Sequence, residues 1–358
     1  MAKFHKLKVA DVRKETADCV SVAFTIPDNL RAEYKFIQGQ YLTLKLFVNG
    51  EEIRRSYSIC SSPLENEMRV AVKRVKDGRG SNFINDKLNA GDEVEVMNPM
   101  GSFHSSISSI NKKNYVLFAG GSGITPIFSI VKTVLQSEPN STIQLVYGNL
   151  NEEAIIFKQQ LDELARTNSS RLKIYYILDK PTSSVPDLHK GLMTEDKANT
   201  LISAYVNIKS DNEYFICGPT PMMDNVKAVL EKLNVEKPRV HIEYFTPVSA
   251  SAEKSSVPAV AAGEKIVSKV TIIQYGAETT FELSSDGKAI LDAAIQHGVD
   301  APFACKGAVC ATCRGKILEG KVYMEKNFAL TDSEVAEGYI LTCQSHPTTP
   351  VVKVDYDI

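Results

Sequence analysis

Residues 304–315 read ACKGAVCATCRG, and they contain Cys305, Cys310 and Cys313 in the spacing C-x4-C-x2-C. A fourth cysteine, Cys343, stands well beyond this stretch. Three thiolates from one short loop and a fourth from a distant segment are the plant-type ligands of a [2Fe–2S] cluster. The other residues of the loop are mostly small, so backbone N–H groups can approach an inorganic core. The sequence therefore predicts an iron–sulfur domain, with these four cysteines as metal ligands.

Three other uses of cysteine fit the pattern less well. A zinc site is normally built from two closely spaced Cys or His pairs, whereas only Cys310-x2-Cys313 forms such a pair. His346 follows Cys343 with two residues between them, as in a Rieske centre, but the matching second His is missing. A disulfide framework is not indicated, because the remaining cysteines are scattered along the chain at Cys19, Cys60 and Cys217.

The composition is that of an ordinary globular chain, with 358 residues and a formal net charge of −2. This length suggests two or three domains. The balanced charge gives no general attraction to nucleic acid or to an anionic membrane, so neither is expected as a partner. No signal peptide or spanning segment is evident, and an iron–sulfur cluster beside free thiols fits a reducing compartment. We therefore expect a cytoplasmic location.

Four segments of different pattern follow one another along the chain. Residues 1–110 contain short strands separated by turns, which indicates an antiparallel β-barrel. Residues 111–247 alternate apolar strands with helices, which is typical of a doubly wound α/β domain with a parallel sheet. Residues 248–265 are rich in Ala, Ser, Val and Pro without a regular period, so we expect a flexible linker. Residues 266–358 then form a small α+β domain of the β-grasp type.

The predicted elements can be placed from their apolar patterns. In the barrel, strands are expected at 20–26, 40–48, 54–60, 68–75 and 92–98. In the α/β domain, strands are expected at 114–120, 142–149, 171–178 and 213–218, with helices from Pro126, around 153–166 and from Pro221. In the last domain, a hairpin at 269–275 and 278–284 precedes a helix at 288–298, the cysteine loop and three short strands.

Two motifs in the barrel region favour a planar ligand that carries phosphate. Arg55-Ser56-Tyr57-Ser58 follows a hairpin turn expected at Asn49-Gly50. Its Arg offers a bidentate fork to phosphate, its Tyr a stacking face and its Ser a hydrogen bond. Gly78-Arg79-Gly80-Ser81-Asn82 opens a helix, where backbone N–H groups can bind an anion. An exposed polar strand and an ordinary capped turn are the alternatives for the two motifs.

Two further motifs end strands of the α/β domain. Gly120-Gly121-Ser122-Gly123-Ile124-Thr125-Pro126 follows the first strand, with Thr125 expected as the helix N-cap and Pro126 as the first helical residue. Its glycines allow a pyrophosphate to approach the backbone at the carboxyl edge of the sheet. Cys217-Gly218-Pro219 stands at the same edge. The alternative for Cys217 is a small buried residue without a function.

In this order, R-x-Y-S, G-G-S-G-x-T-P and C-G-P resemble the motifs of the ferredoxin–NADP reductase superfamily over residues 1–247. With the plant-type ferredoxin domain appended, the whole chain resembles the reductase components of bacterial multicomponent oxygenases. Within that group it is most similar to the reductase subunits of phenylacetyl-CoA epoxidases. The resemblance implies FAD, a [2Fe–2S] cluster and NADPH as cofactors, and an oxygenase or epoxidase component as the electron acceptor.

The resemblance also implies roles for individual residues. Tyr57 and Ser58 would orient the flavin ring, and Thr125 and Cys217 would place the nicotinamide against it. The residues implied to hold the flavin are Arg55, Ser56, Tyr57, Ser58, Val72, Lys73, Gly80, Ser81, Asn82, Glu243 and Phe245. Those implied to lie near the nicotinamide nucleotide are Gly121, Gly123, Thr125, Cys217, Gly218, Pro219 and Met222.

Two points about the cofactors stay open. NADPH-dependent members often carry an Arg shortly after Tyr-Gly-Asn, whereas here Tyr147-Gly148-Asn149 is followed by Leu150-Asn151-Glu152-Glu153. NADH therefore stands as an alternative to NADPH. Reductases of the phthalate dioxygenase type share this domain order and use FMN, whereas the G-R-G-S segment favours FAD.

The implied function is transfer of electrons from NAD(P)H through the flavin and the cluster to an oxygenase. No protein acid or base is needed for hydride transfer, so none of the six histidines is assigned a role. Two other functions remain: a flavin enzyme that reduces a small acceptor directly, and an iron–sulfur sensor that binds nucleotide only for regulation. The acceptor is expected to contact the surface around Lys306, Arg314 and Lys316. The residues of this surface do not identify the acceptor.

Overall fold

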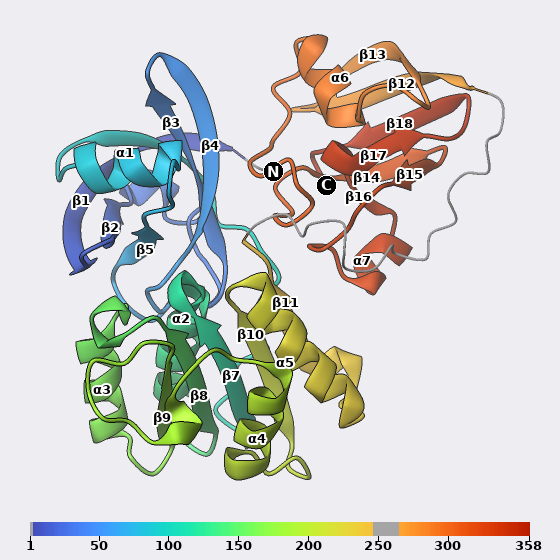
Figure 1. The fold of residues 1–358 in the computed structure, drawn as a ribbon. Coiled ribbons are helices and arrows are strands. Elements are labelled where there is room, and N and C mark those ends of the chain that lie inside the picture. The colour runs from blue at the N-terminus through green and yellow to red at the C-terminus, as the bar shows by residue number, and fades with distance from the viewer. Residues whose placement is uncertain (1–2, 246–264) are drawn as a thin grey trace. The chain divides into compact units, whose positions relative to one another are not determined.

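The computed structural model describes residues 3–245 and 265–358 (Figure 1). The predicted linker at 248–265 lies outside the described residues except for its last position. Two compact units are distinguished, one made of residues 6–53 and 57–243, the other of residues 244–358 with 1–5 and 54–56. Within the described ranges, no helix is both long and apolar enough to cross a membrane.

The first part of the larger unit is the predicted antiparallel barrel, drawn in blue in Figure 1. Its six strands have the order β4-β3-β6-β1-β2-β5. Ile59, directly after β4, forms an antiparallel bridge with Val70 on β5, which brings the two edge strands together. Its elements are β1 (Phe4–Thr16), β2 (Cys19–Thr25), β3 (Tyr41–Val48), β4 (Glu51–Ser58), β5 (Met68–Lys73), α1 (Arg79–Lys87) and β6 (Glu93–Met97).

The expected turn at Asn49-Gly50 is confirmed, because both residues have positive φ, 54° and 81°, as a tight hairpin turn requires. Strand β1 was not predicted. Its pairing with β2 shifts register between Val9 and Asp11 and again between Lys14 and Thr16. These irregularities break the alternation of apolar and polar residues by which a strand is recognised.

The second part of the larger unit is a parallel five-stranded sheet of order β11-β10-β7-β8-β9. From β7 the chain moves outward to β8 and β9, then returns to β10 and β11 on the other side. The carboxyl ends of β7 and β10 therefore border the switch point where doubly wound folds bind ligands. The elements are β7 (Asn114–Gly120), α2 (Ile124–Ser137), β8 (Thr142–Asn149), α3 (Lys158–Thr167), β9 (Leu172–Leu178), α4 (Glu195–Tyr205), β10 (Asn212–Cys217), α5 (Thr220–Lys232) and β11 (Val240–Glu243).

Three expectations for this sheet are corrected. Thr125 is not the N-cap of α2, because the helix begins at Ile124 with Gly123 as its N-cap, which places Thr125 and Pro126 inside the first turn. The helix expected at 153–166 is instead a short 3-10 turn followed by α3, because Phe157 adopts a left-handed conformation with φ 62°. Helix α4 and strand β11 were not predicted.

The smaller unit has a sheet of order β13-β12-β18-β14-β16 and a separate pair β15-β17. The predicted hairpin is confirmed as the antiparallel pair β12–β13. Five strands follow the cysteine loop, not three, because three of them are only three residues long, and two of these, β15 and β17, pair apart from the main sheet. The elements are β12 (Val267–Gln274), β13 (Ala277–Ser284), α6 (Ile290–Gln296), β14 (Arg314–Glu319), β15 (Val322–Met324), α7 (Asp332–Ala336), β16 (Tyr339–Leu341), β17 (Ser345–Pro347) and β18 (Val351–Asp355).

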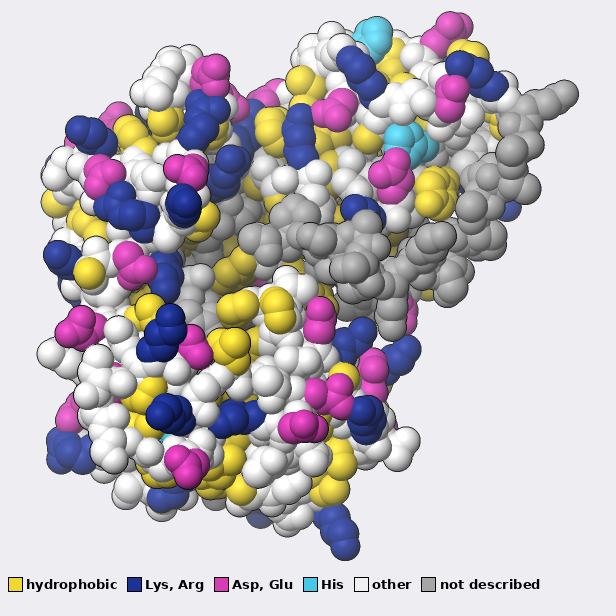
Figure 2. Space-filling view, viewed as in Figure 1, with side chains coloured by type: hydrophobic (Ala, Val, Ile, Leu, Met, Phe, Trp, Pro, Cys, Tyr) yellow, Lys and Arg dark blue, Asp and Glu magenta, His cyan; other side chains and the backbone are white. Residues whose placement is uncertain are grey.

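Charged side chains of both signs are interspersed on the face shown in Figure 2. This mixture agrees with the nearly balanced charge of the sequence.

Candidate electron-transfer site

The turns after β7 and β10 are in direct backbone contact. A Cβ on Gly123 would lie 2.0 Å from the carbonyl oxygen of Cys217 and 2.7 Å from the nitrogen of Gly218. A Cβ on Gly120 would in turn lie 2.6 Å from Pro219. Glycine is therefore required for this approach, and the two motifs predicted from sequence form one surface at the switch point. Met222 borders this surface, because its sulfur would lie 2.8 Å from a Cβ on Gly120.

A carboxyl group, a thiol and a hydroxyl meet at the end of this sheet. Cys217 and Glu243 are neighbours in the parallel register of β10 and β11. The Ser58 hydroxyl, at the end of barrel strand β4, donates to Oε2 of Glu243 over 3.4 Å. Three residues that are remote in sequence, all named as candidates, are thus brought together where the barrel meets the nucleotide sheet.

Burial sets the protonation states of Glu243 and Cys217. It raises the pKa of Glu243 to about 8, against which the hydrogen bond with Ser58 acts weakly. Burial also raises the pKa of the Cys217 thiol well above its usual range. Both side chains are therefore predominantly protonated at neutral pH, and the site carries no fixed negative charge of its own. Thr125 is buried nearby on α2, where its hydroxyl donates to the carbonyl oxygen of Ser122.

Lys73, at the end of β5, faces the glycine-rich turn. Its Nζ lies 3.8 Å from the position that a Cβ on Gly121 would take, and it forms an ion pair of 3.6 Å with Asp18. Gly121 is left-handed with φ 51°, and the Tyr147 hydroxyl donates to its carbonyl oxygen over 3.0 Å. An ammonium group beside open backbone suits an anionic ligand. Sequence reasoning did not identify the role of Tyr147 in holding this turn, although it noted the Tyr-Gly-Asn segment.

The remaining barrel candidates lie on β4 and at the start of α1. Arg55 is exposed and donates to the carbonyl oxygen of Arg54 over 2.8 Å. The Ser81 hydroxyl accepts from the Val75 N–H over 3.1 Å, so it holds the preceding turn, whereas the N-cap of α1 is Gly78 and not a Ser or Asn as the alternative expected. Asn82 differs, because its enclosed side-chain oxygen has no hydrogen-bond partner among the described residues. Such an oxygen at a helix N-terminus is consistent with a ligand beside it.

The candidates Ser56, Tyr57, Val72, Gly80 and Phe245 have less distinctive surroundings. Tyr57 and Ser58 share β4, where Tyr57 is partly exposed and Ser58 is buried. Val72 is fully buried in the barrel core, so only its backbone could face a ligand. Phe245 follows β11 and is 40% exposed.

The four predicted metal ligands gather in the smaller unit as two pairs. The N–H of Cys305 donates to Sγ of Cys310 over 3.3 Å, and the N–H of Gly307 donates to Sγ of Cys305 over 3.3 Å. The thiol of Cys310 lowers the pKa of Cys305 through a hydrogen bond, and Cys313 acts in the same way on Cys343.

The loop around these cysteines fits an iron–sulfur cluster. Lys306 and Ala308 have positive φ, 48° and 67°, a rare conformation that turns N–H groups toward the sulfurs. In the described residues, no three His, Cys, Asp or Glu side chains are placed to hold a single metal ion. Four thiols in two pairs match the Cys₄ donor set of a two-iron cluster.

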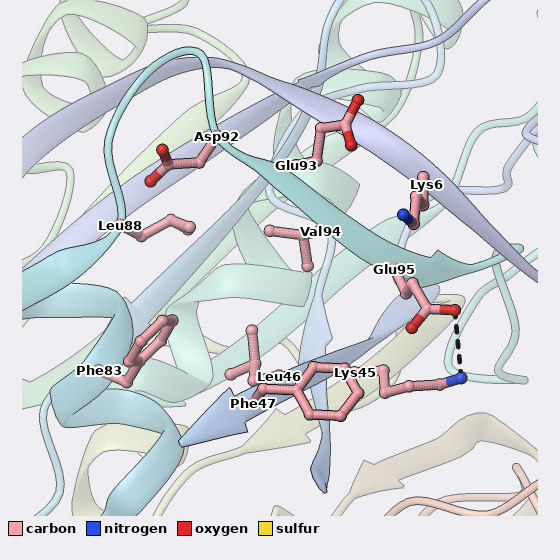
Figure 3. Close-up of a pocket in the computed structure, with 10 residues that line it drawn as sticks. All are labelled: Lys6, Lys45, Leu46, Phe47, Phe83, Leu88, Asp92, Glu93, Val94 and Glu95. Atoms are coloured by element: carbon pink, nitrogen blue, oxygen red, sulfur yellow. Dashed lines mark hydrogen bonds and ion pairs between the residues drawn. The ribbon is translucent and has the colours of Figure 1, made fainter. Parts of the chain in front are cut away.

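A separate hollow of about 410 Å³ opens on the barrel, and none of the predicted residues lines it (Figure 3). It lies where β3 and β6 stop pairing after Lys45 and Glu95, which form an ion pair of 3.2 Å. Its lining consists of Lys6, Lys45, Leu46, Phe47, Phe83, Leu88, Asp92, Glu93, Val94 and Glu95. The candidate site at the switch point is therefore identified from its side chains, and this hollow is not part of it.

Comparisons with known proteins agree with this arrangement. Three family models match: an oxidoreductase FAD-binding domain over residues 6–105, an oxidoreductase NAD-binding domain over 117–228 and a 2Fe-2S iron-sulfur cluster binding domain over 272–348. Most of the described strands fall in the same three regions, and β11 and β18 lie just beyond the ends of the second and third.

Two curated relatives match along their whole length. One of the subunits of the 1,2-phenylacetyl-CoA epoxidase of Escherichia coli is 41% identical, over 100% of this chain and 99% of the relative. The ferredoxin reductase component of 3-ketosteroid-9-alpha-monooxygenase from Rhodococcus rhodochrous is 33% identical, over 98% and 96%. Among solved structures, a phthalate dioxygenase reductase covers 98% of both chains with a TM-score of 0.59 and 26% identity.

The order of the three domains, the paired cysteines and the full-length similarity lead to one assignment. The chain is an oxidoreductase that uses FAD, a pyridine nucleotide and a [2Fe–2S] cluster, and it belongs to the family of reductase components of multicomponent oxygenases.

Proposed function

We propose that this reductase oxidises NAD(P)H and delivers the electrons to the oxygenase component of a phenylacetyl-CoA epoxidase in the cytoplasm. The observation that supports the reductase chemistry best is the meeting of Ser58, Cys217 and Glu243 at the switch point. The choice of an epoxidase partner rests on the 41% identity to the Escherichia coli epoxidase protein over the full length.

A bound flavin would supply the chemistry that links a two-electron hydride donor to a one-electron acceptor. The chain's own residues bind the flavin and the nicotinamide and orient them. We assign Arg55 to the flavin phosphates, Tyr57 to the face of the flavin ring and Ser58 to its edge. Ser56, Val72, Gly80, Ser81 and Asn82 line the rest of the flavin, with Phe245 beyond the end of β11.

The nicotinamide side of the proposed site is set by the turns after β7 and β10. Gly121, Gly123 and Thr125 form one wall, and the second consists of Cys217, Gly218, Pro219 and Met222. Lys73, which the resemblance implies for the flavin, also places a positive charge beside Gly121 of the glycine-rich turn. We propose that the Glu243 carboxyl group is protonated at pH 7, with Oε2 accepting from the Ser58 hydroxyl. A protonated Glu243 would add no negative charge beside the place where hydride transfer is proposed.

In the cluster domain, we assign Cys305, Cys310, Cys313 and Cys343 as ligands of the two irons. We also propose the domain boundaries 1–110, 111–247 and 266–358, with 248–265 as the linker. Acceptor contact is assigned to the surface that carries Lys306, Arg314 and Lys316.

Anaerobic mixing with NADH or NADPH, followed by addition of an acceptor, tests the proposal. We expect the flavin absorbance to bleach and the cluster absorbance to follow under anaerobic conditions, and a purified phenylacetyl-CoA epoxidase oxygenase component to turn over once O2 and phenylacetyl-CoA are admitted. An oxygenase component of a 3-ketosteroid monooxygenase is the matched control acceptor. Equal turnover of both would refute the assigned partner, and a flavin that stays oxidised would refute the reductase chemistry.

A further inference from the structure

Helix α2 carries two buried hydroxyls in the middle of its sequence. Ser129 and Thr133 are 0% and 3% exposed, and they stand four residues apart, so they lie on the same face of the helix. Lys132 and Gln136 continue this face toward the end of the helix. A buried hydroxyl costs free energy unless it is hydrogen-bonded, so the partners of these side chains show what the face contacts.

The partners of this face outside the helix lie in the loop 61–65, which follows β4 almost directly. The Ser129 hydroxyl donates to the carbonyl oxygen of Ser61 over 2.6 Å. The hydroxyls of Ser62 and Thr133 lie 3.0 Å apart, and Oε1 of Gln136 lies 3.2 Å from that of Ser62. Hydrogen bonds therefore run along the helix face from one turn to the next.

The loop is itself held in place at both ends. The N–H of Arg69 on β5 donates to the Ser61 hydroxyl over 3.0 Å. At the other end, Oε2 of Glu65 accepts from the Ser62 N–H over 2.8 Å and forms an ion pair of 2.6 Å with Lys132. One carboxylate thus closes the loop and binds it to α2.

A short route links the proposed flavin strand to the proposed nicotinamide wall through these bonds. Ser58 ends β4, and Ser61 is three residues further on, a reach of at most about 11 Å. Ser129 lies four residues after Thr125, about 6 Å along the axis of α2. The hydrogen bond between Ser129 and Ser61 joins these two short stretches of chain.

Apolar packing joins the same two parts of the larger unit but does not fix their register. One core cluster contains Cys60 and Ala71 from the barrel with Ile124, Ile127 and Phe128 from α2. Apolar contact follows the buried area and has no preferred direction. A hydrogen bond, in contrast, weakens when its distance or angle departs from a narrow range. The hydroxyls therefore add the directional part of this contact.

We infer that Ser129 and Thr133 are positioning residues for hydride transfer, because they hold the glycine-rich turn 120–125 at a fixed spacing from flavin strand β4. This inference rests on the proposed function and names the residues that set the geometry of its site.

A spectrum of the resting complex tests the spacing without turnover. Holoprotein reduced with dithionite is titrated with NAD⁺ or NADP⁺, and the long-wavelength absorbance that a nicotinamide stacked on reduced flavin gives is recorded. The variant Ser129→Ala with Thr133→Val removes both hydroxyls and keeps residues of equal or higher helix propensity. We expect it to retain its flavin and to lose most of this absorbance.

Stopped-flow reduction of the oxidised holoprotein should agree with the spectrum. At saturating NAD(P)H, the double variant should reduce its flavin roughly tenfold more slowly than the wild type, because a small displacement of the reacting groups is costly. Thr133→Val alone should lose part of the absorbance, whereas Thr133→Ser, which keeps the hydroxyl, should retain it. These two single variants decide the matter if the double variant does not fold.

Thr142→Val is the matched control. Its hydroxyl donates to Oδ1 of Asn114 over 2.5 Å at the amino edge of the same sheet, away from the loop 61–65. We expect the absorbance and the rate of the wild type in this variant. An unchanged absorbance and rate in the folded double variant, or equal behaviour of Thr133→Val and Thr133→Ser, would overturn the inference and leave the proposed function standing. A wild type whose flavin stays oxidised with both nucleotides would overturn the proposed function itself.

Discussion

The substitution Gly123→Ala tests whether the turns after β7 and β10 must approach each other closely at the switch point. Gly123 has φ −62° and ψ −10°, which alanine adopts freely, so the substitution introduces no backbone strain. Gly123 is the N-cap of α2, where alanine has no propensity advantage over glycine, although the lower entropy of the unfolded chain would favour alanine by up to about 1 kcal/mol. A loss of stability would therefore come mainly from the contact that the new methyl group makes.

That contact can be sized from the structure. The methyl carbon would lie 2.0 Å from the Cys217 oxygen, whereas ordinary contacts begin at 3.4 Å. The turns must then separate by about 1.4 Å, the difference between these two distances, and the opposing atoms are backbone, which cannot rotate away. We expect a loss of about 1–3 kcal/mol in the free energy of unfolding. A displacement of about 1 Å at a site of this kind can slow the reaction roughly 100-fold.

Gly148→Ala is the control on the neighbouring strand. A Cβ there would have its nearest neighbour at 3.8 Å, an ordinary contact. The assay is anaerobic stopped-flow reduction of the flavin at saturating NAD(P)H, with urea unfolding measured on the same samples. We expect slow reduction and lower stability in Gly123→Ala only. Equal rates and equal stabilities for the two variants would refute the close-packing argument.

Three further outcomes are expected. Cys310→Ser should retain flavin but lose the visible absorbance of the cluster and the reduction of cytochrome c, while NAD(P)H-dependent ferricyanide reduction continues; normal cytochrome c reduction would mean that electrons leave from the flavin. Arg55→Ala should lower flavin occupancy and leave the rate per bound flavin unchanged, so a variant with full occupancy and unaltered flavin affinity would remove Arg55 from the site. Glu243→Gln tests the raised pKa of Glu243. The stability that the neutral carboxyl group contributes is complete below pH 4.5 and is lost as pH rises through about 8. Thermal melting across this range should therefore show the wild type losing stability relative to the variant, by at most about 1.4 kcal/mol per pH unit. Parallel pH profiles of the two proteins would contradict that assignment.

Much of the local structure could be predicted because its signals are local. The strand at 142–149 matches β8 residue for residue, and the turn at Asn49-Gly50 has the expected positive φ values. Helix α4 was missed because it buries only Ala198, Leu201 and Ile202, too few for a clear apolar period. A usable signal was present, since Thr194 caps this helix and two acidic residues open its first turn.

The sequence by itself predicted the four cluster ligands and determined the order of the domains and the glycine-rich turns, because cysteine spacing and strand–turn–helix patterns are properties of neighbouring residues. Only the tertiary structure decided that Ser58 reaches Glu243, that Gly123 touches Cys217 and that Ser129 is bonded to Ser61. These pairs are far apart in sequence, and their meeting depends on strand order and register in the folded sheets. The same burial also sets the ionisation of Glu243, since the pKa of a carboxyl group depends on the surroundings that the fold gives it.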